Sequence, residues 1–169
     1  FTALVEEEIA FANAGKKGLI ILKMNSLQDE RMIKELYKAS NAGVEVRLLI
    51  RGMCSLIPGI VGQSENIYVT SIVDRFLEHG RIYIFGNDGD EKVFIGSADW
   101  MTRNLTHRIE VVTPILDEDH KKTIRDIINI ELEDNVKARI IDAEQSNEYV
   151  KNSKEPVQSQ LAIYEYFKS

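Results

Sequence analysis

The chain has 169 residues, of which 44% are hydrophobic and 28% are charged, and its formal net charge is −6. These values fit one soluble globular domain with a core of its own, and they exclude a disordered chain. Apolar runs are too short for a membrane span. The acidic balance argues against a general nucleic-acid-binding protein, which usually has a basic surface, so we expect no nucleic-acid partner.

The first half is predicted to contain helix 2–14, strand 18–25, helix 26–43, strand 44–50 and loop 51–66. Apolar residues at helical spacing indicate the helices, and Ser26 and Gly43 suit the start and the end of the second one. The order strand, helix, strand predicts a parallel crossover unit. Three glycines and a proline favour the long loop, and loops of that length are often functional.

The second half is predicted to contain strands 67–73, 81–87, 92–97, 108–115 and 137–142 and helices 117–133 and 155–168. The turn "NDGD" (87–90) is a strong hairpin signal between two of these strands. With no internal repeat and no internal boundary, residues 1–169 are predicted to form a single α/β domain, a mixed sheet flanked by helices.

The single cysteine, Cys54, excludes an intrachain disulfide, so a reducing, cytoplasmic location is expected. The N-terminus shows an acidic helical pattern and no signal peptide. Because the chain opens at Phe1 with no initiator methionine, we expect a piece of a longer protein.

Polar and charged residues gather at the predicted strand ends, namely Arg51, His79, Arg81, Ser97, Asp99, Arg103, Asn104 and Glu110. In crossover α/β folds, ligands bind at the carboxyl ends of strands. Arginine offers a bidentate fork for phosphate oxygens, and imidazole can donate to phosphate or act as a nucleophile. The pattern therefore favours an anionic, phosphorylated ligand.

Each of these residues also has a purely structural interpretation. His79 suits an exposed turn, Arg51 suits a surface charge at a strand end, and Asp99 and Asn104 suit turn caps. No spacing of histidine, cysteine and aspartate is typical of a metal site.

Several long stretches, taken in order, closely resemble the C-terminal end of bacterial polyphosphate kinases: "LLIRGMCSLIPG" (48–59), "SIVDRFLEHGRIYIF" (71–85), "SADWMTRN" (97–104), "RIEVVTPILD" (108–117), "VKARIID" (136–142) and "QLAIYEYFKS" (160–169). The resemblance implies reversible transfer of the terminal phosphate of ATP onto polyphosphate. It also implies a phospholipase D-like fold, in which two similar α/β halves face each other across the active site.

The resemblance is to the second catalytic half. His79 is followed by Gly80 and Arg81 where a phospholipase D half has His-x-Lys, and "GSAD" (96–99) stands where that superfamily has Gly-Ser-x-Asn. The phosphorylated histidine of the family belongs to the first half, so we expect the nucleophile to lie outside this chain and the isolated domain to be inactive.

Carried over residue by residue, the family pattern implies that His79 and Arg51 contact the ATP phosphates and that Glu110 orients His79 as a catalytic pair. Arg81 and Arg103 are expected to line the polyphosphate path. Magnesium is implied by the family, held by the nucleotide or the other half. Expected partners are ATP or ADP, polyphosphate, the remaining domains of the enzyme and further copies in a homo-oligomer. The whole enzyme is expected in the cytoplasm or associated with a membrane.

Two other functions remain open at this point. The domain could be a non-catalytic module that binds nucleotide or polyphosphate, or half of a phospholipase D-like phosphodiesterase.

Overall fold

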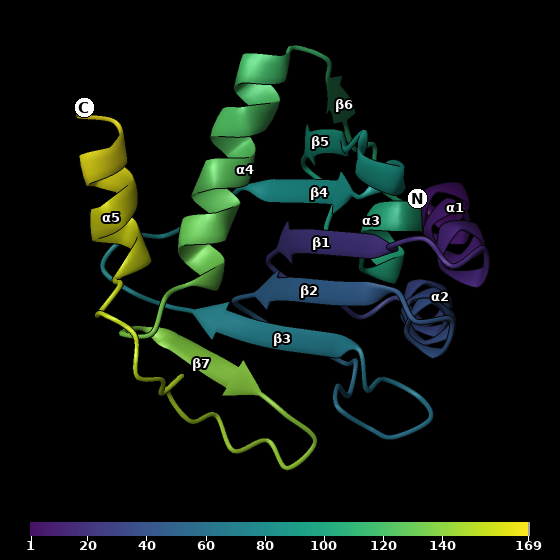
Figure 1. Cartoon of the computed structure of the whole chain (residues 1–169), viewed down its shortest axis with the longest axis horizontal. Helices are drawn as coiled ribbons and strands as arrows, with labels where there is room; N and C mark the ends of the chain where they lie inside the picture. The colour runs from purple at the N-terminus through teal and green to yellow at the C-terminus, as the bar shows by residue number, and fades with distance from the viewer. Residues whose placement is uncertain (169) are drawn as a thin grey trace.

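The apolar run predicted as the first strand lies near the centre of a seven-stranded sheet (Figure 1). The structure is a computed structural model and describes residues 1–168. Its helices are α1 (Thr2–Asn13), α2 (Glu30–Asn41), α3 (Thr102–Thr106), α4 (Glu118–Leu132) and α5 (Ser159–Tyr166). Its strands are β1 (Leu19–Met24), β2 (Glu45–Ile50), β3 (Ile67–Ile72), β4 (Arg81–Phe85), β5 (Lys92–Gly96), β6 (Val112–Ile115) and β7 (Ala138–Ile141).

The sheet is mixed, with strand order β6-β5-β4-β1-β2-β3-β7. Strands β1, β2 and β3 are parallel, and the other neighbours pair antiparallel. The predicted parallel crossover is confirmed, because α2 connects β1 to β2. The predicted single domain with a mixed sheet and flanking helices is also confirmed.

Alternating side chains of the central strands build two cores, one on each face of the sheet. On β1, Ile20 and Leu22 pack in one cluster with residues of α1 and α2. Leu19 and Ile21 pack in the other cluster, with Ile128 of α4. Figure 1 shows the α1–α2 pair on one side of the sheet and the α4–α5 pair on the other. The two clusters show that β1 is covered on both faces. No helix within residues 1–168 is long and apolar enough to span a membrane.

The hairpin predicted at "NDGD" is confirmed, since β4 and β5 pair antiparallel across it. A short 3₁₀ turn, Asn87–Gly89, closes it. Its three residues all have positive φ, at 45°, 55° and 102°. Asparagine, aspartate and glycine tolerate this left-handed backbone better than other residues, which explains their use here.

Several predicted elements begin later in the structure than expected. The strand predicted over 108–115 begins only at Val112. Before it, the backbone N–H of Val111 donates to the hydroxyl of Ser97 (3.1 Å), so a side chain takes a bond that a sheet partner would otherwise provide. The final helix begins at Ser159, later than predicted, where the carboxylate of Asp134 accepts the Ser159 N–H (2.7 Å). The short helix α3 was not predicted.

Candidate functional site

The parallel strands β1 and β2 end at the same edge of the sheet. Met24 lies opposite Ile50 in their register, so the next residues, Asn25 and Arg51, leave the sheet side by side. The loop after Arg51 lies directly on Asn25, because the Gly52 N–H donates to the Asn25 carbonyl (2.8 Å). A Cβ at Gly52 would lie only 2.8 Å from that carbonyl oxygen, so glycine is needed for this close approach.

The antiparallel hairpin brings a second set of residues to this edge. β4 begins at Arg81, directly after His79 and Gly80. β5 ends at Gly96, which lies opposite Arg81, and the chain then reaches Asp99. The sheet register therefore gathers Arg51, His79, Arg81 and Asp99 at one edge, as the strand-end argument predicted.

Arg81 and Asp99 form a buried ion pair in the middle of this group. Their exposed fractions are 9% and 6%, and Arg81 donates from Nε (3.2 Å) and Nη2 (3.1 Å) to the two carboxylate oxygens. Asp99 also accepts the backbone N–H of Asn25 (2.8 Å). Burial by itself would raise the pKa of Asp99, but the bonds from Arg81 and Asn25 outweigh burial and hold that pKa below its ordinary value.

Arg81 also holds His79, whose side chain is exposed. The Arg81 Nη1 lies 2.8 Å from the imidazole Nδ1, nearer than the 3.3 Å to Nε2, and it donates to the His79 carbonyl at 2.8 Å. A guanidinium can only donate, so a neutral imidazole in this contact accepts at Nδ1 and carries its proton on Nε2. The Nε2 proton is then available to a phosphate oxygen.

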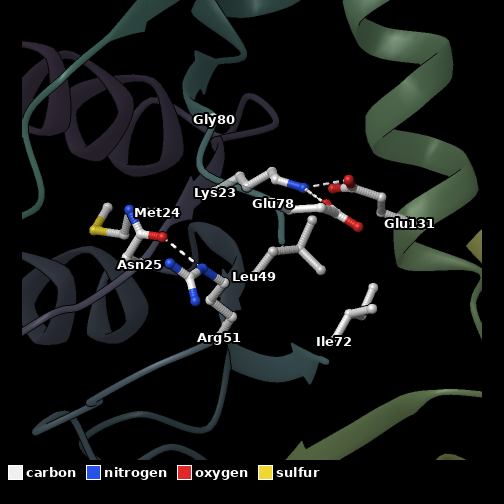
Figure 2. Close-up of a pocket in the computed structure, with 9 residues that line it drawn as sticks. All are labelled: Lys23, Met24, Asn25, Leu49, Arg51, Ile72, Glu78, Gly80 and Glu131. Atoms are coloured by element: carbon white, nitrogen blue, oxygen red, sulfur yellow. Dashed lines mark hydrogen bonds and ion pairs between the residues drawn. The ribbon is translucent and has the colours of Figure 1, made fainter. Parts of the chain in front are cut away.

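Asn25 joins Arg51 to the same network. The Arg51 Nε donates to Asn25 Oδ1 (2.6 Å), and Asn25 Nδ2 donates to Asp99 Oδ1 (3.3 Å). Figure 2 shows the Arg51 side chain directed at the Asn25 amide. We call Arg81, Asp99 and Asn25 the polar bridge, because these three residues connect His79 to Arg51 by continuous hydrogen bonds.

Two of the predicted site residues, Glu110 and Arg103, lie outside the polar bridge. Glu110 accepts from the Ser97 hydroxyl and from Asn104 Nδ2 (2.6 Å), which together lower its pKa. Within residues 1–168 no hydrogen bond joins Glu110 to His79, so the expected orienting contact belongs to Arg81 instead. The reason is that β6 begins only at Val112, so Glu110 lies before the strand, where Ser97 and Asn104 hold its carboxylate. Arg103 is exposed on α3.

A cluster of ionisable groups lies beside Arg51 in a narrow pocket (Figure 2). The ammonium of Lys23 on β1 lies between the carboxylates of Glu78 and Glu131, and Glu78 directly precedes His79. Burial raises the pKa of Glu131 to about 8, against the opposing effect of Lys23. Burial and the nearby Glu78 carboxylate both favour the protonated form of Glu131 on α4.

Replacing Glu131 with glutamine should change how stability depends on pH. The folded-state pKa of about 8 exceeds the ordinary 4.5. The contribution of Glu131 to stability is complete below pH 4.5 and falls as pH rises through about 8. From pH 5 to 9 the free energy of unfolding of Glu131→Gln, relative to the unsubstituted domain, should rise by on the order of 4 kcal/mol, about three pKa units at about 1.36 kcal/mol each. Urea unfolding measures it, with the exposed Glu30→Gln as the matched control. A difference that stays constant with pH would contradict the assignment.

Asn25 and Lys23 were missed by the sequence analysis, although both left a signal. Asn25 is the first polar residue after a buried strand, which is the rule that selected Arg51. Lys23 interrupts an apolar strand, and a charge inside such a run requires a buried partner. The partner, Glu131, lies 108 positions away, so the sequence did not reveal the pair.

One His-x-Lys triplet does occur, from His120 to Lys122. It lies in the first turn of α4, and the exposed His120 imidazole contacts Asp117 at 3.2 Å. This triplet is therefore separate from the polar bridge and from the sheet edge where the polar bridge lies.

Comparison with known proteins decides the family. The family model "Polyphosphate kinase C-terminal domain 2" matches residues 1–160. The chain belongs to the polyphosphate kinase family. The polyphosphate kinase of Vibrio cholerae is 56% identical over 167 residues, which are 98% of this chain and 24% of that protein. The Escherichia coli K12 polyphosphate kinase is 55% identical with the same coverage.

Solved structures give the same result for the fold. The polyphosphate kinase from Porphyromonas gingivalis superposes with a TM-score of 0.96 at 52% identity, covering 99% of this chain and 26% of that one. Nuc, a phospholipase D family member from Salmonella typhimurium, has a TM-score of 0.56 at 15% identity over 80% of this chain and 88% of its own. The predicted phospholipase D-like fold is confirmed. This polyphosphate kinase domain spans about a quarter of the length of its relatives.

Proposed function

We propose that this domain supplies the nucleotide-phosphate-binding side of a polyphosphate kinase active site. In this site Arg51 and His79 bind the phosphates of ATP while its terminal phosphate is transferred to or from polyphosphate. The observation that carries the proposal is the polar bridge, which connects these two exposed or half-exposed side chains at one sheet edge. Family membership supports the reaction class.

The chemistry asked of these residues is mainly electrostatic. Phosphoryl transfer spreads negative charge over the equatorial oxygens, and fixed cations and donors stabilise that charge. Arg51 offers the guanidinium nitrogens that are not bonded to Asn25. His79, held at Nδ1 by Arg81, offers its Nε2 proton to a phosphate oxygen or to the leaving oxygen. Asp99 balances the charge of Arg81, so Arg81 serves as a buried support for His79.

Magnesium does not fit a protein site here. Within residues 1–168 no group of three or more metal-ligating side chains occurs. The nearby carboxylates are already engaged, Asp99 by Arg81 and Glu78 by Lys23. Magnesium usually binds one or two carboxylates together with substrate phosphates. No step of the proposed role is therefore assigned to a metal held by these residues. Arg103, exposed on α3, is proposed to line the polyphosphate path.

The test replaces His79 or Arg51 with alanine in the full-length enzyme. We expect synthesis of polyphosphate to fall on the order of 100- to 1,000-fold, as for the loss of a donor to a developing charge. Affinity for ATP is measured in parallel, and His120→Ala, at an exposed histidine of α4, is the matched control. Synthesis at the unsubstituted rate in both variants would refute the proposed site.

The parallel measurement separates this role from a docking module. Loss of turnover with ATP affinity retained supports a chemical role for His79. Loss of affinity with unchanged turnover at saturating ATP supports docking, the alternative that the exposed setting of His79 favours.

A further inference from the structure

The segment 73–80, which carries His79, is held in place almost entirely by side chains. It has no helix or strand, and within residues 1–168 no backbone–backbone hydrogen bond from a turn or loop reaches it. Its apolar side chains do not anchor it either, since Phe76 is 62% and Leu77 is 76% exposed. Such a segment should move easily unless specific bonds fix it.

Gln160, in the first turn of α5, makes several of those bonds. Its Oε1 accepts the Phe76 N–H (2.9 Å), and its Nε2 donates to the Phe76 carbonyl (2.8 Å). The amide thus satisfies both main-chain groups of one residue, as a neighbouring strand would. The same Nε2 lies 2.8 Å from Glu78 Oε1, and Glu78 is also held by Lys23.

A second glutamine strengthens the contact between α5 and the segment. Gln158, which precedes the helix, donates from Nε2 to the Asp74 carboxylate (2.6 Å). The segment is therefore fixed at three points before His79 by the C-terminal helix and β1. Arg81 fixes it after the imidazole.

From this geometry we infer that Gln160 is a positioning residue for the proposed phosphate site, acting through the 73–80 segment on His79. The inference rests on the proposed function of His79. A loosened segment would let the imidazole leave its place beside Arg81, and displacements of about 1 Å in an active site can lower rates on the order of 100-fold. Gln160 itself needs no contact with the substrate. The C-terminal helix thereby becomes part of the active-site support although it lies outside the sheet edge.

The experiment is a double-mutant cycle in the full-length enzyme. Gln160→Ala and the similarly sized Gln160→Met are each made alone and combined with His79→Gln, and kcat/KM for ATP and ATP affinity are measured. The control is Leu161→Ala, at a half-exposed residue of the same helix. Thermal unfolding of every variant checks that the fold is intact.

We expect kcat/KM to fall 10- to 100-fold in both Gln160 variants. In the His79→Gln background the same substitutions should change kcat/KM less than about twofold, because the group that they position is already altered. Where turnover is below detection, the same limit applies to ATP affinity. An equal loss in both backgrounds would show that Gln160 acts independently of His79 and would overturn the inference. Unchanged kcat/KM in Gln160→Ala, beside a strong loss in His79→Gln, would also overturn it and would leave the proposed function intact. An unchanged His79→Gln enzyme would instead refute the proposed function, and this inference with it.

Discussion

Replacing Asp99 with alanine is expected to lower the free energy of unfolding of this domain by about 3–5 kcal/mol. The substitution leaves the Arg81 guanidinium, 9% exposed, without its counter-charge. It also removes the acceptor of the Asn25 and Ser26 backbone N–H groups. Because domains are stable by only about 5–15 kcal/mol, this is a large fraction of the total.

The measurement is urea unfolding of the purified domain, followed by the fluorescence of its one tryptophan. Trp100 is fully buried and adjacent to Asp99, so it reports on this region. The matched control is Glu30→Ala, which breaks the exposed Glu30–Lys34 pair (2.6 Å) and should change stability by less than about 0.5 kcal/mol. A loss below about 1 kcal/mol for Asp99→Ala would contradict the account of the buried pair.

The purified domain by itself should make no detectable polyphosphate from ATP and magnesium. The prediction rests on the proposed function, in which the phosphorylated histidine lies outside this chain, and this chain spans 24% of the length of its relatives. His79 accepts a bond at Nδ1 from Arg81, which suits a donor at Nε2 more than a nucleophile. The imidazole of His79 is exposed in this domain, so water has free access to it.

Polymer formation is followed over hours, with the full-length enzyme at equal concentration as the positive control. Circular dichroism and the Trp100 fluorescence of the isolated domain confirm that it is folded. Robust polymer synthesis by the domain would contradict the proposal that the nucleophile lies outside this chain.

Much of the fold follows from local patterns. The crossover from β1 through α2 to β2 was predictable because a mainly apolar run, an N-cap region and a glycine stop agree with each other. The helix begins at Glu30, a few residues after Ser26, because Asp29 takes the capping role by accepting the Met32 N–H (3.1 Å). The late start of β6 was not predictable, since it depends on the Ser97 hydroxyl, which is distant in sequence from Val111.

The location of the site could be predicted from the sequence, but the hydrogen bonds between its residues could not. The strand-end rule selected Arg51, His79, Arg81 and Asp99, all of which the sheet register brings to one edge. Their hydrogen bonds depend on side-chain directions, which no pattern in the sequence specifies. The family resemblance implied that Glu110 lies beside His79, whereas Arg81 contacts the imidazole there.

The most direct test of the central claim is a crystal structure of the full-length enzyme with a non-hydrolysable ATP analogue. We predict that the Arg51 guanidinium and the His79 Nε2 each lie within about 3.2 Å of a phosphate oxygen of one nucleotide. The Arg81–Asp99 pair should remain intact beneath them. Phosphates bound elsewhere, with Arg51 and His79 directed at different surfaces, would contradict it.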